Sequence, residues 1–224
     1  MTTSSGSRPI STLRTRSSQR SRPDGPAAGP LILGIDPGSR VTGYGFIRQD
    51  RGAPRCERSG VIATLARLSF PDRLLQIHDA LEALLVEMRP AEVAVESAYV
   101  RKSALAALMI GHVRGVIIVA ARKSGAEVFE YTAPEVKMAV VRNGAAQKGQ
   151  VEFMVRRLLP GLAKLREDEA DALAVALCHA QRGNLRELGI VGGARAGVTG
   201  GSGRGVAPAI RAAQAAARAA RRRA

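Results

Sequence analysis

The sequence predicts an α/β protein in which a five-stranded mixed sheet is flanked by helices and lies between two disordered basic tails. Three β-prone apolar segments follow one another between residues 31 and 65, which favours an antiparallel meander. Two further apolar segments alternate with helical stretches, and such β-α-β steps require right-handed crossovers into parallel pairing. Both chain ends are rich in Arg and in small or polar residues, which favours tails rather than core.

The domain boundaries follow from composition. The chain has 224 residues, enough for one domain with tails. Residues 1–29 contain Ser, Arg, Pro and Gly with few large apolar groups, so we expect a disordered basic extension there. Residues 189–224 are rich in Gly, Ala and Arg and are predicted to be a disordered tail. The folded domain is therefore expected at residues 30–188.

Charge is concentrated in these tails. The formal net charge is +15, which indicates a polyanionic partner, with nucleic acid ahead of an anionic membrane. Residues 1–30 carry five Arg and one Asp, and residues 193–224 carry seven Arg and no acid. The remaining part of the chain is thus only mildly basic. The tails would add salt-sensitive, sequence-independent affinity for nucleic acid.

The first three predicted strands lie in residues 31–65. Leu31 to Ile35 is a short apolar run that ends at Asp36, and Pro37-Gly38 predicts a tight turn directly afterwards. Val41 to Ile47 resumes a strand pattern, and Cys56 to Leu65 forms the third strand. One carboxylate is therefore expected at the end of the first strand, on the edge of the sheet.

Helices and two more strands follow. A helix from Pro71 ends at Arg89-Pro90, and its apolar residues recur at spacings of three and four. Glu92 to Glu96 is the fourth strand and ends in a carboxylate, as the first does. The remaining elements are predicted as a helix over 103–122, a strand over 127–131, and helices over 134–141, 147–159 and 168–181.

The helix over residues 103–122 is apolar almost all round, which predicts that it is mostly buried. Two explanations stay open for its apolar surface: ordinary core packing, or an interface with a second copy of the chain. No apolar run is expected to approach the ~20 residues needed to cross a membrane. The two cysteines, Cys56 and Cys178, lack a metal-site or disulfide spacing, which favours a reduced cytoplasmic setting.

Four carboxylates are candidates for a shared site. If the first and fourth strands are neighbours, Asp36 and Glu96 lie side by side, while Asp168 and Asp171 share one face of the last helix. Acids on an apolar helix face are unusual. Taken singly, each has a structural alternative: Asp36 in a turn, Glu96 at a strand end, Asp168 as a helix cap and Asp171 near the dipole. Glu167 and Glu169 are expected to be solvated.

Four acids at one sheet edge could not all ionise unaided, because like charges raise each other's pKa. Two divalent metal ions would solve that problem, and oxygen ligands suit Mg²⁺, with Mn²⁺ as the alternative. Two such ions about 4 Å apart activate water and stabilise a leaving oxygen in phosphodiester cleavage. The sequence therefore predicts Asp36, Glu96, Asp168 and Asp171 as catalytic metal ligands.

The chain resembles the RuvC family of Holliday-junction resolvases across about residues 31–182. The matching stretches are LILGIDPGSRVTGYG, AVES, GHVRGV, VFEYTAPEVKMAVV, QKGQVEFMVRRLL and DEADALAVALCHA. The resemblance implies an RNase H-like fold and an Mg²⁺-dependent crossover junction endodeoxyribonuclease. Its acidic quartet maps onto the four residues above, although some members have His in place of Asp168.

The resemblance also implies a homodimer whose two sites nick opposing strands of a four-way DNA junction symmetrically, in recombination and repair. It further implies a partner, the RuvA–RuvB branch-migration complex. An isologous dimer supplies the two identical sites that two symmetric cuts require. Lys137 and Lys148 lie in matching stretches, where the family's lysines touch the DNA backbone near the cleavage site.

Other DNA contacts are expected around the site. The predicted set, beside Lys137 and Lys148, is Arg40, Tyr99, Arg101, Lys102 and Arg114. Tyr99 would stack on an unpaired base, with a packed loop aromatic as the alternative. Arg40 is equally compatible with surface solvation, and Arg114 with an ion pair across a dimer. The three histidines, His78, His112 and His179, are expected to be structural.

Two rival functions are compatible with parts of the sequence. A nucleotide-binding protein of the actin and sugar-kinase superfamily also has an Asp-x-Gly turn after its first strand. Such proteins need a second Asp-x-Gly phosphate loop and a second domain, which this chain lacks, and they have no terminal Asp-x-x-Asp helix. A non-catalytic junction-binding relative is the other rival, and the presence of all four acids argues against it.

Overall fold

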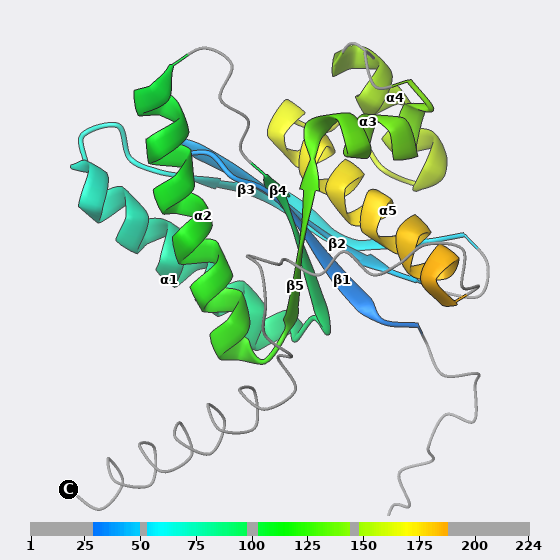
Figure 1. The fold of residues 1–224 in the computed structure, drawn as a ribbon, viewed down its shortest axis with the longest axis horizontal. Coiled ribbons are helices and arrows are strands. Elements are labelled where there is room, and N and C mark those ends of the chain that lie inside the picture. Colours follow the sequence, from blue (N-terminus) through cyan, green and yellow to red (C-terminus); the bar gives the residue numbers. More distant parts are fainter. Residues whose placement is uncertain (1–28, 50–52, 98–102, 144–147, 188–224) are drawn as a thin grey trace, which may run out of the picture.

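The structure, a computed structural model, describes residues 29–49, 53–97, 103–143 and 148–187. Five strands and five helices occur in the predicted order (Figure 1). They are β1 (Leu31–Asp36), β2 (Val41–Arg48), β3 (Arg55–Ala63), α1 (Phe70–Met88), β4 (Glu92–Ser97), α2 (Ala104–Ser124), β5 (Glu127–Thr132), α3 (Ala133–Val141), α4 (Lys148–Leu158) and α5 (Glu167–Glu187). The predicted tails fall almost wholly outside the described residues.

The strands form one mixed sheet in the order β3-β2-β1-β4-β5. The first three strands pair antiparallel, and β4 and β5 add in parallel on the other side of β1. Both the meander and the crossovers were predicted from the order of apolar segments, and both are confirmed. The neighbouring position of β1 and β4, which the shared carboxylate site required, is confirmed as well.

Helices cover the two faces of the sheet separately (Figure 1). Helices α1 and α2 lie on one face, over a core that includes Leu33, Ile35 and Val95. Helices α3, α4 and α5 lie on the other face, over a core that includes Ile32 and Ala94. Successive residues of β1 and β4 alternate between these two cores, as the period of a strand requires.

Helix α5 lies very close to β1 and β2. A Cβ atom added at Gly34 would stand 2.2 Å from the carbonyl oxygen of Ala172, and one added at Gly43 would stand 1.9 Å from that of Asp168. Only glycine fits at these two strand positions, because backbone atoms of the helix occupy the space of any side chain. The glycines that interrupt both strands therefore determine how closely α5 approaches the sheet.

Helix α2 departs from its prediction. Only one face of it is buried, by Val113, Ile117, Ala120 and Ala121, whereas Leu105 and Leu108 are 67% and 60% exposed. Its 21 residues are also long and apolar enough to span a bilayer by length and composition, so the expectation that no run approaches that length was wrong. Because α2 connects two strands of one sheet and packs on α1, its inner face is part of the core.

The ends of the elements follow local chemistry. Ser69 and Ser103 accept hydrogen bonds from backbone N–H groups in the first turns of α1 and α2, as N-cap residues do. Gly125 ends α2 in the left-handed conformation, with a φ of 93°. Helix α5 extends to Glu187, beyond the predicted end at residue 181, because one internal Gly183 costs only about 1 kcal/mol.

Candidate active site

The first two candidate carboxylates stand side by side. Strand β1 is parallel to β4, and Ile35 pairs with Val95, so that Asp36 and Glu96 each follow a paired residue at the same edge of the sheet. Alternate residues of a strand point to the same face of the sheet, so Asp36 shares the face of Ile32, and Glu96 shares the face of Ala94. Both carboxylates therefore belong to the face that α5 covers. Both are half-buried.

The first turns of α5 bring the other two acids to this edge. The backbone carbonyl of Asp168 packs on Gly43, and Gly43 is the residue of β2 that pairs with Asp36. Asp171 lies three residues later, on the same side of the helix, and is also half-buried. The sheet register and the close approach of α5 thus bring all four acidic residues to one edge of the sheet.

The turn after Asp36 is closed by a side chain. Thr42, which is buried, donates a 2.7 Å hydrogen bond from its hydroxyl to the carbonyl of Gly38, and the Gly38 N–H donates back to the same hydroxyl. Gly38 is required here, because a Cβ atom would lie 2.0 Å from the carbonyl oxygen of Val41. The chain therefore turns away directly after Asp36.

The donors present are carboxylate oxygens, which suit Mg²⁺ or Mn²⁺. As their side chains stand, no three of the described His, Cys, Asp and Glu residues are close enough to hold a metal ion. Asp168 belongs to the acidic first turn of α5, where the helix dipole favours negative charge.

Glu169, which was expected to be solvated, is a link between α5 and β3. It accepts a 2.6 Å hydrogen bond from the Ser59 hydroxyl and a 3.3 Å bond from the backbone N–H of Arg166. Sequence spacing could not reveal this contact, since Ser59 is 110 residues away. Glu169 therefore holds the start of α5, beside Asp168, against the third strand.

Arg114 forms a contact within the chain that the sequence analysis did not predict. Its guanidinium forms an ion pair with Glu130 of β5 in the same chain, and both side chains are about three-quarters buried. The predicted DNA contact, and the alternative of an ion pair across a dimer, stay predictions. The pair with Glu130 was not predicted from sequence, because Glu130 lies on the strand after α2 and the crossover brings the two residues together.

The other predicted DNA contacts are only partly among the described residues, and they stay predictions. Arg40 is exposed just after the turn, and Lys137 is half-buried on α3. Lys148 begins α4, and its side chain is not among those described. Tyr99, Arg101 and Lys102 lie in the segment 98–102, outside the described residues.

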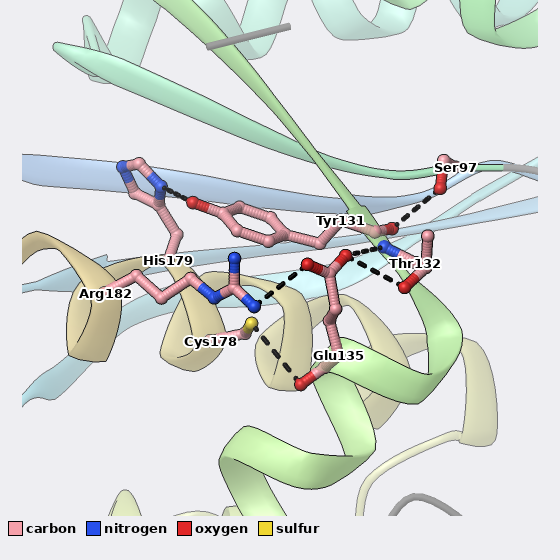
Figure 2. Close-up of polar contacts among 7 residues, drawn as sticks. All are labelled: Ser97, Tyr131, Thr132, Glu135, Cys178, His179 and Arg182. Carbon is pink, nitrogen blue, oxygen red and sulfur yellow. Dashed lines mark hydrogen bonds and ion pairs between the residues drawn. The ribbon is translucent and has the colours of Figure 1, made fainter. Parts of the chain in front are cut away.

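A buried polar cluster joins α5 to strands β4 and β5, and the sequence analysis did not predict its contacts. The expectation that His179 has a structural role is confirmed by these contacts. The Tyr131 hydroxyl lies 2.7 Å from His179 Nδ1 (Figure 2). His179 Nε2 lies 3.0 Å from a carboxylate oxygen of Glu92. His179 is 1% exposed, and its ring also packs 4.4 Å from that of Phe129. A histidine on an otherwise apolar helix was the only signal.

The start of α3 adjoins this cluster. Glu135 accepts two 2.8 Å hydrogen bonds from Thr132, forming a capping box, and pairs with Arg182 of α5 (Figure 2). Burial opposes the ionisation of Glu135, but the bonds from Thr132 and Arg182 outweigh it and lower its pKa below 4.5. Burial also raises the pKa of the Cys178 thiol to about 11, so this thiol is protonated at neutral pH.

The opposite side of the molecule carries an apolar groove between α1 and α2. The groove has a volume of about 790 Å³ and includes Leu74, Leu75, Leu108, Val116 and Val119 in its lining. Leu75 and Val119 are 60% and 56% exposed. A surface of this kind on a single chain indicates an interaction site.

Comparisons with known proteins agree on one family. The family model described as crossover junction endodeoxyribonuclease RuvC matches residues 32–179. A relative of that name from Acidiphilium cryptum is 50% identical over 149 residues, which are 66% of this chain and 89% of the relative. The one from Citrifermentans bemidjiense is 45% identical over 158 residues, which are 70% of this chain and 96% of the relative.

Solved structures agree with the sequence comparison. The Thermus thermophilus RuvC structure superposes with a TM-score of 0.63 at 32% identity, covering 71% of this chain and 97% of that one. T. thermophilus RuvC in complex with a Holliday junction substrate gives a TM-score of 0.65 at 32% identity, with 72% and 97% covered. These matches confirm the RNase H-like fold that the resemblance implied.

Proposed function

The chain belongs to the RuvC family of crossover junction endodeoxyribonucleases, and on that premise we propose that Asp36, Glu96, Asp168 and Asp171 are its catalytic centre. The chain is a nuclease that hydrolyses phosphodiester bonds and resolves Holliday junctions in DNA recombination. This assignment excludes the nucleotide-binding alternative of the actin and sugar-kinase type. A non-catalytic relative would have to keep four acids at one sheet edge without using them.

One observation carries the proposal for the site. The carbonyl of Asp168 packs on Gly43, which pairs with Asp36. On the other side of β1, Ile35 pairs with Val95, so the next residues of the two strands, Asp36 and Glu96, lie side by side. Three elements that are far apart in sequence therefore deliver acids to one edge. A structural alternative would have to apply to each acid separately, whereas a shared site accounts for all of them together.

The four carboxylates would hold two Mg²⁺ ions, or Mn²⁺ in their place, and these supply an activated water and charge stabilisation at the phosphodiester. Asp36 is the central ligand in this proposal, because β1 lies between β2 and β4 and Asp36 pairs with Gly43, on which the Asp168 carbonyl packs. Asp168 and Asp171 approach from the helix, and Glu96 from the neighbouring strand. The turn at Pro37-Gly38 removes the chain from the space beside Asp36.

Basic residues near the site would bind the junction backbone. Lys137 on α3 and Lys148 at the start of α4 are the proposed phosphate contacts, since an ammonium on a flexible stem suits a phosphate. Arg40, Arg101 and Lys102 are proposed to add further charge. Tyr99 is proposed to stack on an unpaired base at the junction centre.

Two symmetric cuts require two active sites, so we propose a homodimer. The exposed apolar face of α1 and α2, with Leu75, Leu108 and Val119, is the proposed interface, because a second copy of this chain would cover a groove of about 790 Å³ on each partner. Of the two explanations left open for the apolar helix, exposure of these leucines favours the interface.

The cellular context is proposed from the family alone. The RuvA–RuvB branch-migration complex would supply the junction, and the reaction would take place in the cytoplasm during recombination and DNA repair.

The proposed role of Mg²⁺ can be checked directly on the purified chain. Symmetric nicks in a mobile synthetic four-way junction are expected with Mg²⁺ and not with EDTA.

The decisive variant is Asp36→Asn, which keeps the shape of the side chain and removes its charge. We expect junction affinity in a gel-shift assay to stay within about twofold of the parent, while cleavage falls by about a thousandfold or more, since ion-ligand contacts contribute several kcal/mol to the transition state. Asp72→Asn, a change at an exposed acid at the start of α1, serves as the control. Cleavage by Asp36→Asn at the parental rate would exclude this catalytic centre.

A further inference from the structure

The carboxylates of the proposed catalytic centre come from two separate bodies, the sheet and α5. Asp36 and Glu96 are strand residues, whereas Asp168 and Asp171 move with the helix. The spacing between the two pairs therefore depends on how α5 is rotated and shifted on the sheet. Catalysis of this kind is sensitive to small displacements of the reacting groups.

Close packing sets how near α5 lies to the sheet. Along α5, Gly34 and Gly43 meet Ala172, Ala176 and the backbone carbonyls of Asp168 and Ala172. Small, smooth surfaces fix the distance between helix and sheet, but they resist rotation or sliding less than directional contacts do. A hydrogen bond, in contrast, weakens steeply when its angle or length changes.

His179 supplies a directional contact to β4 and β5, as Glu169 does to β3. It lies two turns beyond Asp171 on the same helix, about 12 Å along the axis. Its Nδ1 is 2.7 Å from the Tyr131 hydroxyl and its Nε2 is 3.0 Å from the Glu92 carboxylate, so both ring nitrogens are engaged. In the tautomer that carries its proton on Nε2, the ring donates to the Glu92 carboxylate and accepts from the Tyr131 hydroxyl at Nδ1, so both partners are satisfied.

The partners of His179 belong to the strands that hold Glu96. Glu92 is the first residue of β4, and Tyr131 pairs in register with Glu96 itself. The Ser97 hydroxyl donates a 3.1 Å hydrogen bond to the Tyr131 carbonyl, next to Glu96 (Figure 2). The guanidinium of Arg182 lies over the Tyr131 ring, 5.4 Å from its centre.

We propose that His179 is a positioning residue for the nuclease reaction: held between Tyr131 and Glu92, it fixes α5 on β4 and β5 and so sets Asp168 and Asp171 relative to Glu96. This inference rests on the proposed catalytic centre and adds a part of the chain remote from DNA. The ring touches no substrate. Its effect reaches the reaction only through the position of the helix.

The main test is Tyr131→Phe, which removes one oxygen atom and keeps the ring. We expect kcat for junction cleavage to fall about tenfold, with the KM for the junction within twofold of the parent. Mn²⁺ affinity measured by calorimetry should weaken tenfold or more, as is typical when a group that orients a ligand is lost. Ile77→Val, in the core on the opposite sheet face, is the control for a loss of melting temperature.

Glu92 provides an independent pair of variants if Tyr131→Phe does not fold. Glu92→Gln keeps an acceptor for Nε2–H and should keep kcat within about threefold of the parent. Glu92→Leu removes the acceptor and should behave like Tyr131→Phe. Unchanged Mn²⁺ affinity, or a kcat loss no larger than that of Ile77→Val, would overturn the inference. Parental cleavage by Asp36→Asn would instead overturn the catalytic centre beneath it.

Discussion

The two faces of the sheet are covered in opposite ways. On the α5 face, glycines in the strands meet alanines and backbone atoms of the helix, and the helix is buried from residue 172 to residue 180. On the other face, large aliphatic side chains separate the sheet from α1 and α2, and the outer side of α2 remains apolar and exposed. Two polar side chains of α5, Glu169 and His179, also form hydrogen bonds to strands of the sheet.

This difference separates two tasks. Close backbone contact with directional polar anchors leaves a helix little freedom, which suits the face that carries half of the proposed catalytic centre. Packing through long aliphatic side chains needs less exact geometry. That face keeps surplus apolar surface, which suits association with a second copy. Substitutions on the two faces should therefore have different consequences.

The largest effect is expected where α5 touches the sheet. Gly34→Ala would bring a Cβ atom to 2.2 Å from the carbonyl oxygen of Ala172, so the helix must move. We expect a loss of about 3 kcal/mol in the free energy of unfolding, measured by urea denaturation, together with loss of cleavage. Gly183→Ala, on α5 but in open space, is the control and should stabilise by about 0.5–1 kcal/mol. A Gly34→Ala variant with unchanged unfolding free energy and unchanged cleavage would contradict the close approach of α5 to β1.

On the opposite face, Leu108→Asp should disturb association and leave the fold intact. Leu108 is 60% exposed, so the change costs the single chain little. In a dimer it would bury a charge, and we expect a loss of about 2 kcal/mol or more in association, measured by analytical ultracentrifugation. Paired cutting should become sequential single nicks. A dimer of unchanged affinity would move the proposed interface elsewhere.

Arg114 tests a smaller contribution on the same face. Arg114→Ala would leave Glu130 three-quarters buried without its ion pair, and a loss of about 1–2 kcal/mol in unfolding free energy is expected. Junction affinity should be unchanged. Arg58→Ala, which removes the exposed pair with Glu87, should cost less than about 1 kcal/mol. Weaker junction binding by Arg114→Ala, without a loss of stability, would support the DNA contact predicted from sequence.

The smallest effect concerns the start of α3 and depends on pH. The pKa of Glu135 is lowered in the folded chain, so its stabilising contribution is present above the ordinary value of 4.5 and is lost as pH falls through the lower folded value. Glu135→Gln should therefore melt a few degrees below the parent at pH 7, and the gap should close below pH 4.5. A gap that is independent of pH would contradict the assigned cause.

Local patterns in the sequence were enough to predict the elements, their order and the acids expected at the strand ends. Apolar spacing, Pro and Gly act within a few residues, so the ends of β1 and α1 could be predicted closely. Asp36 and Glu96 were found because each directly follows an apolar strand. The Asp168 and Asp171 pair was found from its helical spacing.

Contacts between residues that are far apart in the sequence could be assigned only from the folded chain. The ion pair of Arg114 with Glu130, the bond from Ser59 to Glu169 and the bridge through His179 join different elements. No local periodicity encodes such contacts, because they depend on strand order and on the closeness of α5. The exposure of α2 was mispredicted for the same reason: apolar residues all round a helix do not tell how much of it the rest of the chain covers.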